Sequence, residues 1–100
     1  MLLHHLQISF CSLLKASHIK PWRVSNDYER LDHFNGLLLV PNLDTAFDSG
    51  LIAFRDSGEV IISTLFKDPQ TLGVDHLMSI ETEPSHYPYL DYHRQKVFKE

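Results

Sequence analysis

The tripeptide Asp56-Ser57-Gly58 constrains the fold of this 100-residue chain more than any other feature. It lies between two runs, 51–55 and 59–63, and the second run is rich in β-branched side chains. A short turn sequence containing glycine between two such runs is typical of a β-hairpin, whose strands pair antiparallel. The chain is therefore expected to contain at least one antiparallel sheet.

Short elements separated by turn residues are predicted on both sides of this hairpin. Proline and glycine mark their boundaries, as at Lys20-Pro21, Asn35-Gly36 and Ser49-Gly50. Before the hairpin we expect strands over 13–19 and 37–40 and short helices over 28–33 and 41–49. After it we expect helical turns from residue 67, again over 76–80, and a last helix over about 87–99. This order of short strands and helices indicates a small α+β domain.

Size and composition limit what such a domain can be. Apolar residues make up 43% of the chain, enough for one core, although a domain this small buries only about 60 to 65% of its unfolded surface. The longest stretch without Lys, Arg, Asp or Glu, 1–14, is too short for the roughly 20 residues that span a bilayer. It also lacks the basic start of a secretory signal, so we expect a cytoplasmic protein. The single cysteine excludes an internal disulfide and a cysteine-based zinc cluster.

The distribution of charge is more informative than its total. A formal net charge of −4 argues against a general electrostatic DNA binder. Basic residues nevertheless gather in the first third of the chain and again near its end, where His93-Arg94 could touch a phosphate. Two such groups would flank a phosphate backbone if the fold brought them together, whereas ordinary solvated surfaces are the alternative interpretation.

One ordered set of polar residues suits hydrolytic chemistry: His18 at a strand end, Asn35 in a turn and Asp44 on a helix. An imidazole can take a proton from water, while a divalent ion held by a carboxylate stabilises charge on a phosphate and on the leaving oxygen. Asn35 suits a loop-holding role, because its amide accepts no proton at neutral pH. Taken singly, each residue fits a structural role equally well.

The order of these residues and their neighbours resembles the HNH endonucleases, whose site is a ββα-metal fold, and in particular a branch of bacterial restriction-type nucleases. The matching stretches are Ala16–Trp22, Arg30–Asp32, Asn35–Leu39, Leu43-Asp44, Phe47–Ile52 and, as a closing helix, Tyr89–Arg94. The resemblance implies an HNH nuclease domain over 13–100, with the hairpin and C-terminal helices added to the ββα unit. Residues 1–12 do not match and are expected to be what remains of a truncated N-terminal region.

The resemblance also implies roles for individual residues. His18 would be the general base and Asn35 the structural asparagine that fixes the loop bearing it. Asp44 would ligate a metal ion, with Asp48, one helical turn later, as a second or water-mediated ligand. The ion is expected to be Mg²⁺, with Mn²⁺ or Zn²⁺ as alternatives. The phosphate contacts with DNA would come from the bases that flank the histidine: Lys15, Lys20 and Arg23.

Two departures from the family pattern leave alternatives open. Ser17 stands where metal-binding members often carry an acid or a histidine, and a hydroxyl is a poor ligand. The strand-and-helix region expected ahead of Ala16 is not recognisable. The first hypothesis is a DNA-cleaving HNH endonuclease in restriction or defence, with a homodimer as a sensible assembly. The others are a truncated, inactive nucleic-acid-binding or interaction module and a small structural domain. Trp22 is expected to be a packing residue, with base stacking as the alternative.

Overall fold

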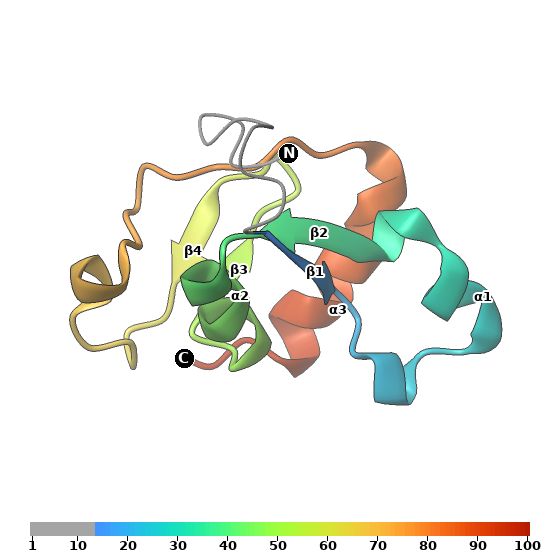
Figure 1. Cartoon of the computed structure of the whole chain (residues 1–100), viewed down its shortest axis with the longest axis horizontal. Coiled ribbons are helices and arrows are strands. Elements are labelled where there is room, and N and C mark those ends of the chain that lie inside the picture. Colours follow the sequence, from blue (N-terminus) through green and yellow to red (C-terminus); the bar gives the residue numbers. More distant parts are fainter. Residues whose placement is uncertain (1–13) are drawn as a thin grey trace.

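The computed structural model describes residues 14–100 and contains two small antiparallel sheets (Figure 1). In the first sheet β1 (Lys15–His18) pairs with β2 (Gly36–Leu39). In the second, β3 (Ile52–Phe54) and β4 (Val60–Ile62) form the predicted hairpin. The α+β fold class is thus confirmed. The expected non-matching segment at the N-terminus lies outside the described residues.

Helix α2 (Pro41–Asp48) connects the two sheets. It begins directly after β2 because Pro41 takes the first helical position, where its fixed φ and missing N–H are favourable. Its apolar side is at most 2% exposed and belongs to the hydrophobic core: Leu43, Ala46 and Phe47. Helix α2 contacts β1, β2 and β3, and Figure 1 shows it between the sheets. Strands β1 and β2 therefore pack on one helix, α2, together with β3 of the other sheet.

The connection from β1 to β2 is a largely exposed excursion. It contains the 3-10 turns η3 (Trp22–Val24) and η4 (His33–Asn35) and, between them, the short helix α1 (Asp27–Leu31), none of whose residues is buried. Helix α1 is started by a capping box, in which the Asn26 side chain accepts from the Glu29 amide at 2.8 Å and the Glu29 carboxylate accepts from the Asn26 amide at 2.8 Å. Side-chain caps, rather than core packing, thus define this helix.

Helix α3 (Tyr87–Lys96), preceded by the 3-10 turn η6 (Pro84–His86), closes the core and packs against β3. It ends earlier than the predicted residue 99, because the chain turns onto the loop after α2. There the amide of Lys99 donates to the carbonyl of Gly50 at 2.8 Å. Gly50 has φ +81°, so no other residue would fit this turn without strain.

The segment 76–80 was predicted to be a helical turn, but only its first two residues lie in a turn, closed by the Met78 amide on the Asp75 carbonyl at 3.0 Å, and residues 78–80 are extended. Ser79 forms an antiparallel bridge with Glu59, and the Ile80 amide donates to the Gly58 carbonyl at 2.8 Å. The hairpin offers unpaired backbone groups along β4, and pairing with them outweighs the weak local helix preference of 76–80. The helical turn expected from residue 67 is the 3-10 helix η5 (Pro69–Leu72). No helix within residues 14–100 is long and apolar enough to cross a membrane.

Candidate active site

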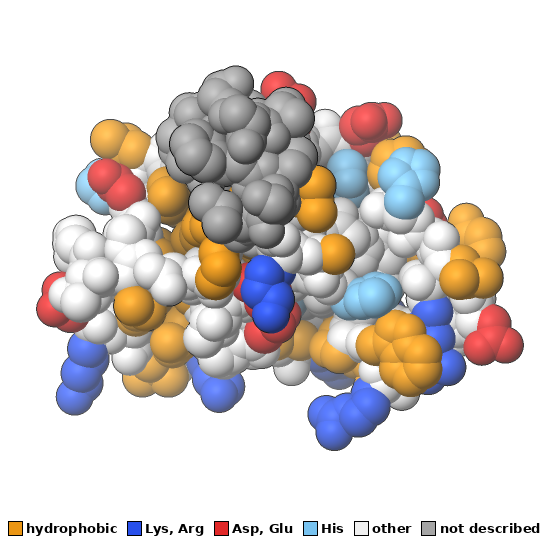
Figure 2. Space-filling model, viewed as in Figure 1, with side chains coloured by type: hydrophobic (Ala, Val, Ile, Leu, Met, Phe, Trp, Pro, Cys, Tyr) orange, Lys and Arg blue, Asp and Glu red, His pale blue; other side chains and the backbone are white. Residues whose placement is uncertain are grey.

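A pocket of about 470 Å³ opens beside β1 and is lined from β1, η3, α2 and α3. Its walls include His18 together with Asp44 and Asp48, and the bases Lys15 and Arg23. Figure 2 shows basic, acidic and histidine side chains near one another on the face over β1 and η3. The fold therefore brings together the predicted base, both predicted metal ligands and two of the predicted phosphate contacts.

His18 is the last residue of β1, paired with Gly36, and its side chain is half-buried. Its Nε2 lies 3.5 Å from the carbonyl oxygen of Arg30, a long contact whose strength depends on the tautomer. With the proton on Nε2, facing that carbonyl, the imidazole keeps a lone pair on Nδ1. Such a lone pair can accept a proton, and His18 is one of the residues that line the pocket.

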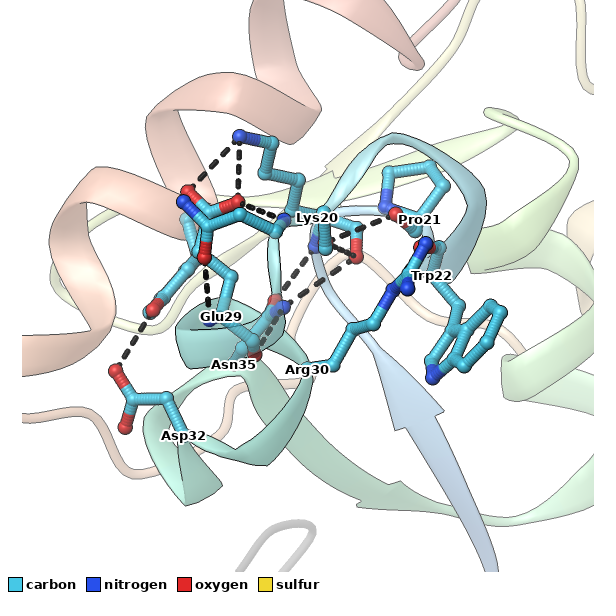
Figure 3. Close-up of polar contacts among 10 residues, drawn as sticks. Lys20, Pro21, Trp22, Glu29, Arg30, Asp32 and Asn35 are labelled. Atoms are coloured by element: carbon cyan, nitrogen blue, oxygen red, sulfur yellow. Dashed lines mark hydrogen bonds and ion pairs between the residues drawn. The ribbon is translucent and has the colours of Figure 1, made fainter.

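Asn35 is completely buried directly behind the segment that follows His18. Its Oδ1 accepts from the Lys20 amide at 2.8 Å, and its Nδ2 donates to the Glu29 carbonyl at 3.1 Å (Figure 3). Its own carbonyl accepts from the Ile19 amide at 3.0 Å. The side chain thus ties the chain after β1 to α1, and it does not line the pocket that holds the carboxylates.

The two aspartates are one turn apart on α2, Asp44 buried and Asp48 exposed. Partial desolvation and the nearby Asp44 carboxylate raise the pKa of Asp48. The Ser17 hydroxyl, which donates to Asp48 at 3.1 Å, and the charge of Lys15 oppose this rise. A bound cation would reduce the repulsion between these two carboxylates, and carboxylate oxygens are the ligands that Mg²⁺ prefers.

The donor set is small. Within the described residues no group of three or more His, Cys, Asp or Glu side chains is arranged to hold an ion. Two carboxylates nevertheless suit Mg²⁺, which usually keeps several waters and takes one or two carboxylates plus the oxygens of a bound phosphate. The residues present therefore fit an ion that binds together with its substrate better than a permanently caged one.

The three predicted phosphate contacts differ in their surroundings. Arg23 is exposed at the pocket and has no ion-pair partner among residues 14–100, and Lys15 is exposed as well. Lys20 instead places its Nζ 2.9 Å from a carboxylate oxygen of Glu29 (Figure 3). The same Nζ lies 5.1 Å from the centroid of the Tyr92 ring. Lys15 and Arg23 are therefore exposed at the pocket, where a ligand can reach them, whereas Lys20 is engaged with Glu29.

Sequence reasoning missed the place of His93. It lines the pocket from α3 but is only 2% exposed, and its ring stacks on Phe47 at 3.8 Å between centroids. Its Nε2 donates to the Phe47 carbonyl at 2.8 Å, and its Nδ1 is buried without a partner among the described residues. Burial lowers the pKa of His93 to about 4, helped by Arg94 and opposed by the hydrogen bond to Phe47. His93 is therefore a neutral histidine that holds α2 against α3.

A phosphate contact from the pair His93-Arg94 is not supported. Besides the burial of His93, the Arg94 guanidinium donates to the Phe54 carbonyl at 2.8 Å and pairs with Asp56 at 3.0 Å. The spacing of Tyr89, Leu90 and His93 along α3 was the available signal, since residues three and four apart share a helix face. Trp22, expected to be a packing residue with base stacking as the alternative, packs against Arg30 but is 56% exposed and lines the pocket.

A sequence model of the HNH endonuclease family matches residues 3–55, more than half of the chain. The protein therefore belongs to the HNH endonuclease family, and the matched range holds His18, Asn35, Asp44 and Asp48. Among three solved chains that match, one is the modification-dependent TagI restriction endonuclease, with a TM-score of 0.54 and 23% sequence identity over 84% of this chain. The match spans only 27% of that enzyme, and at this identity the likeness shows the fold. No curated protein matches significantly.

Proposed function

We propose that this HNH endonuclease hydrolyses phosphodiester bonds of DNA with the help of a divalent metal ion, in a cytoplasmic restriction or other defence setting. One observation carries the proposal: His18 from β1 and the carboxylates of Asp44 and Asp48 from α2 line the same pocket. A proton acceptor and a cation-binding pair facing one cavity are the two components that metal-assisted phosphodiester hydrolysis needs.

Each residue has a distinct task in this mechanism. His18 accepts a proton from the attacking water through Nδ1, while its Nε2 faces the Arg30 carbonyl. Asp44 and Asp48 would hold the ion, most simply Mg²⁺ with Mn²⁺ or Zn²⁺ as alternatives, which when bound supplies stabilisation of charge on the phosphate and leaving oxygen. Asn35 acts as a positioning residue, because its hydrogen bonds fix the chain that follows His18.

DNA is the proposed substrate because two exposed basic side chains border the acidic pair. Lys15 and Arg23 line the pocket and can neutralise phosphates on either side of the bond to be cut. Lys20 stays a predicted contact that would first have to leave Glu29. A homodimer would present one pocket to each strand of a duplex, and light scattering of the protein with and without DNA tests this assembly.

The test is cleavage of supercoiled plasmid by purified protein in Mg²⁺ or Mn²⁺, with EDTA as the metal-free arm. His18→Ala is expected to lower the nicking rate about a hundredfold to ten-thousandfold. Asp44→Asn is expected to abolish the nicking that depends on metal. His76→Ala is the matched control, because the His76 side chain is 80% exposed and does not line the pocket. Equal nicking by wild type and His18→Ala would refute the assignment of the base.

A second outcome identifies the alternative function. Retention of DNA that weakens with salt, without cleavage in either metal, would indicate an inactive nucleic-acid-binding module. Ser17 at the position of a stronger ligand is the feature that favours this alternative, since among residues 14–100 it leaves only the two aspartates as acidic metal ligands at the pocket. If the protein neither binds nor cleaves DNA, the interpretation that remains is a small structural domain.

A further inference from the structure

Trp22 is the only tryptophan of the chain, and the proposed nuclease mechanism gives it no task. It lies in η3, four residues after His18, and lines the same pocket with 56% of its surface exposed. We propose that Trp22 is a base-stacking residue, so that the pocket takes a nucleotide whose base is already unstacked, as in single-stranded or locally opened DNA. This inference rests on the proposed function and specifies its substrate.

The indole ring is covered on one face and open on the other. The Arg30 guanidinium carbon lies 3.8 Å from the ring centroid, so Arg30 stacks on one face of Trp22. Arg30 is held there by its Nε, which donates to the Trp22 carbonyl at 3.0 Å (Figure 3), and by an ion pair with Asp27 at 3.7 Å. Because one face is occupied, the exposed area of the ring must lie on its other face and its edge.

The backbone that carries the ring is firmly fixed. The buried Ser25 donates from Oγ to the Pro21 carbonyl at 2.9 Å, and the Val24 amide donates to the same carbonyl at 3.1 Å. Upstream, the Lys20 amide is held by Asn35 at 2.8 Å. A ring that is ordered before the ligand arrives loses little conformational entropy on binding. The open face of Trp22 is therefore a rigid platform at the rim of the pocket.

The chemistry of the rim matches a single strand better than a duplex. Arg23, next to the ring in sequence, is exposed without an ion-pair partner among the described residues. An aromatic face beside a free cation is the combination that tracks single strands, because the ring stacks on a base while the cation meets the backbone. In an intact duplex both faces of each base are covered by its neighbours, so stacking on Trp22 requires the base to leave the helix first.

The test uses the His18→Ala chain in Mg²⁺, which binds without cutting, and two probes of equal length: a fluorescein-labelled oligothymidylate and a labelled duplex. Fluorescence of Trp22 is expected to be quenched as the oligothymidylate is added. By anisotropy, Trp22→Leu should weaken binding of the single strand about 10- to 100-fold, with Trp22→Phe in between and duplex binding changed much less. Tyr28→Leu, which removes another exposed aromatic ring outside this pocket, should change neither.

Salt dependence separates stacking from charge. Trp22→Leu should leave the slope of log affinity against log salt unchanged, whereas Arg23→Gln should reduce it by about 0.7 on a single strand. Unfolding curves of each variant check that the fold is kept. Two results would overturn the stacking role even if the wild-type protein cleaves plasmid. One is equal single-strand affinity of Trp22→Leu and its parent, and the other is unquenched Trp22 fluorescence in a saturated complex. Absence of both binding and cleavage would overturn the nuclease proposal as well.

Discussion

His93 makes the stability of this fold depend on pH below neutrality. Burial lowers its pKa to about 4, whereas the same side chain in the unfolded chain titrates near its ordinary value of 6.5. Between these values the unfolded state binds a proton that the folded state does not, so stability is full above about pH 6.5 and falls as the pH drops towards 4. The difference corresponds to about 3 kcal/mol across the whole window, about 2 kcal/mol of it between pH 7 and pH 5.

The variant His93→Gln isolates this contribution, because its amide can still donate to the Phe47 carbonyl but does not titrate. Urea unfolding followed by circular dichroism at pH 7 and pH 5 should show wild type losing about 2 kcal/mol more than the variant. His76→Gln controls for the loss of one histidine at an exposed position. If wild type and His93→Gln lose the same stability between these pH values, the buried neutral histidine is not the cause. An NMR titration of the His93 ring provides a direct check.

Three further outcomes follow from single contacts. Asn35→Ala should cost about 2 to 3 kcal/mol of unfolding free energy in urea, because it leaves partly buried backbone groups of Lys20 and Glu29 unpaired; unchanged stability would contradict that role. Gly50→Ala should lower Tm much more than Gly73→Ala, since both have positive φ but only the first places its Cβ 2.1 Å from the Val97 carbonyl; equal losses would show that strain alone matters. Asp48→Asn should raise Tm slightly in EDTA, because the fold disfavours that charge, yet weaken stabilisation by Mg²⁺; a lower Tm in EDTA would contradict this.

Much of the local structure could be predicted because its signals are local. The turn at Asp56-Ser57-Gly58 selects the hairpin, Pro41 starts α2, and the capping box at Asn26 starts α1. The end of the segment 76–80, residues 78–80, was predicted wrongly for the opposite reason. Its conformation depends on pairing with a strand edge that lies far away in sequence, and no local pattern reports such a partner.

The site shows the same division between local and distant information. The order of residues singled out His18 and Asp44, and the fold places both at one pocket. The order of residues could not show that Lys20 forms an ion pair with Glu29, nor that Trp22 remains outside the core. These facts depend on how the excursion between β1 and β2 folds back, which follows from caps and ion pairs made only in the folded chain.

The contact of Lys99 with Gly50 has a practical consequence for protein engineering. The acidic helix α2 is secured at its far end by this backbone hydrogen bond and by the hydrogen bond from His93 to Phe47. Trimming the chain just before Lys99 would release the loop that follows the helix bearing Asp44 and Asp48. A deletion of this kind is expected to lower the proposed cleavage activity although it removes no residue that lines the pocket.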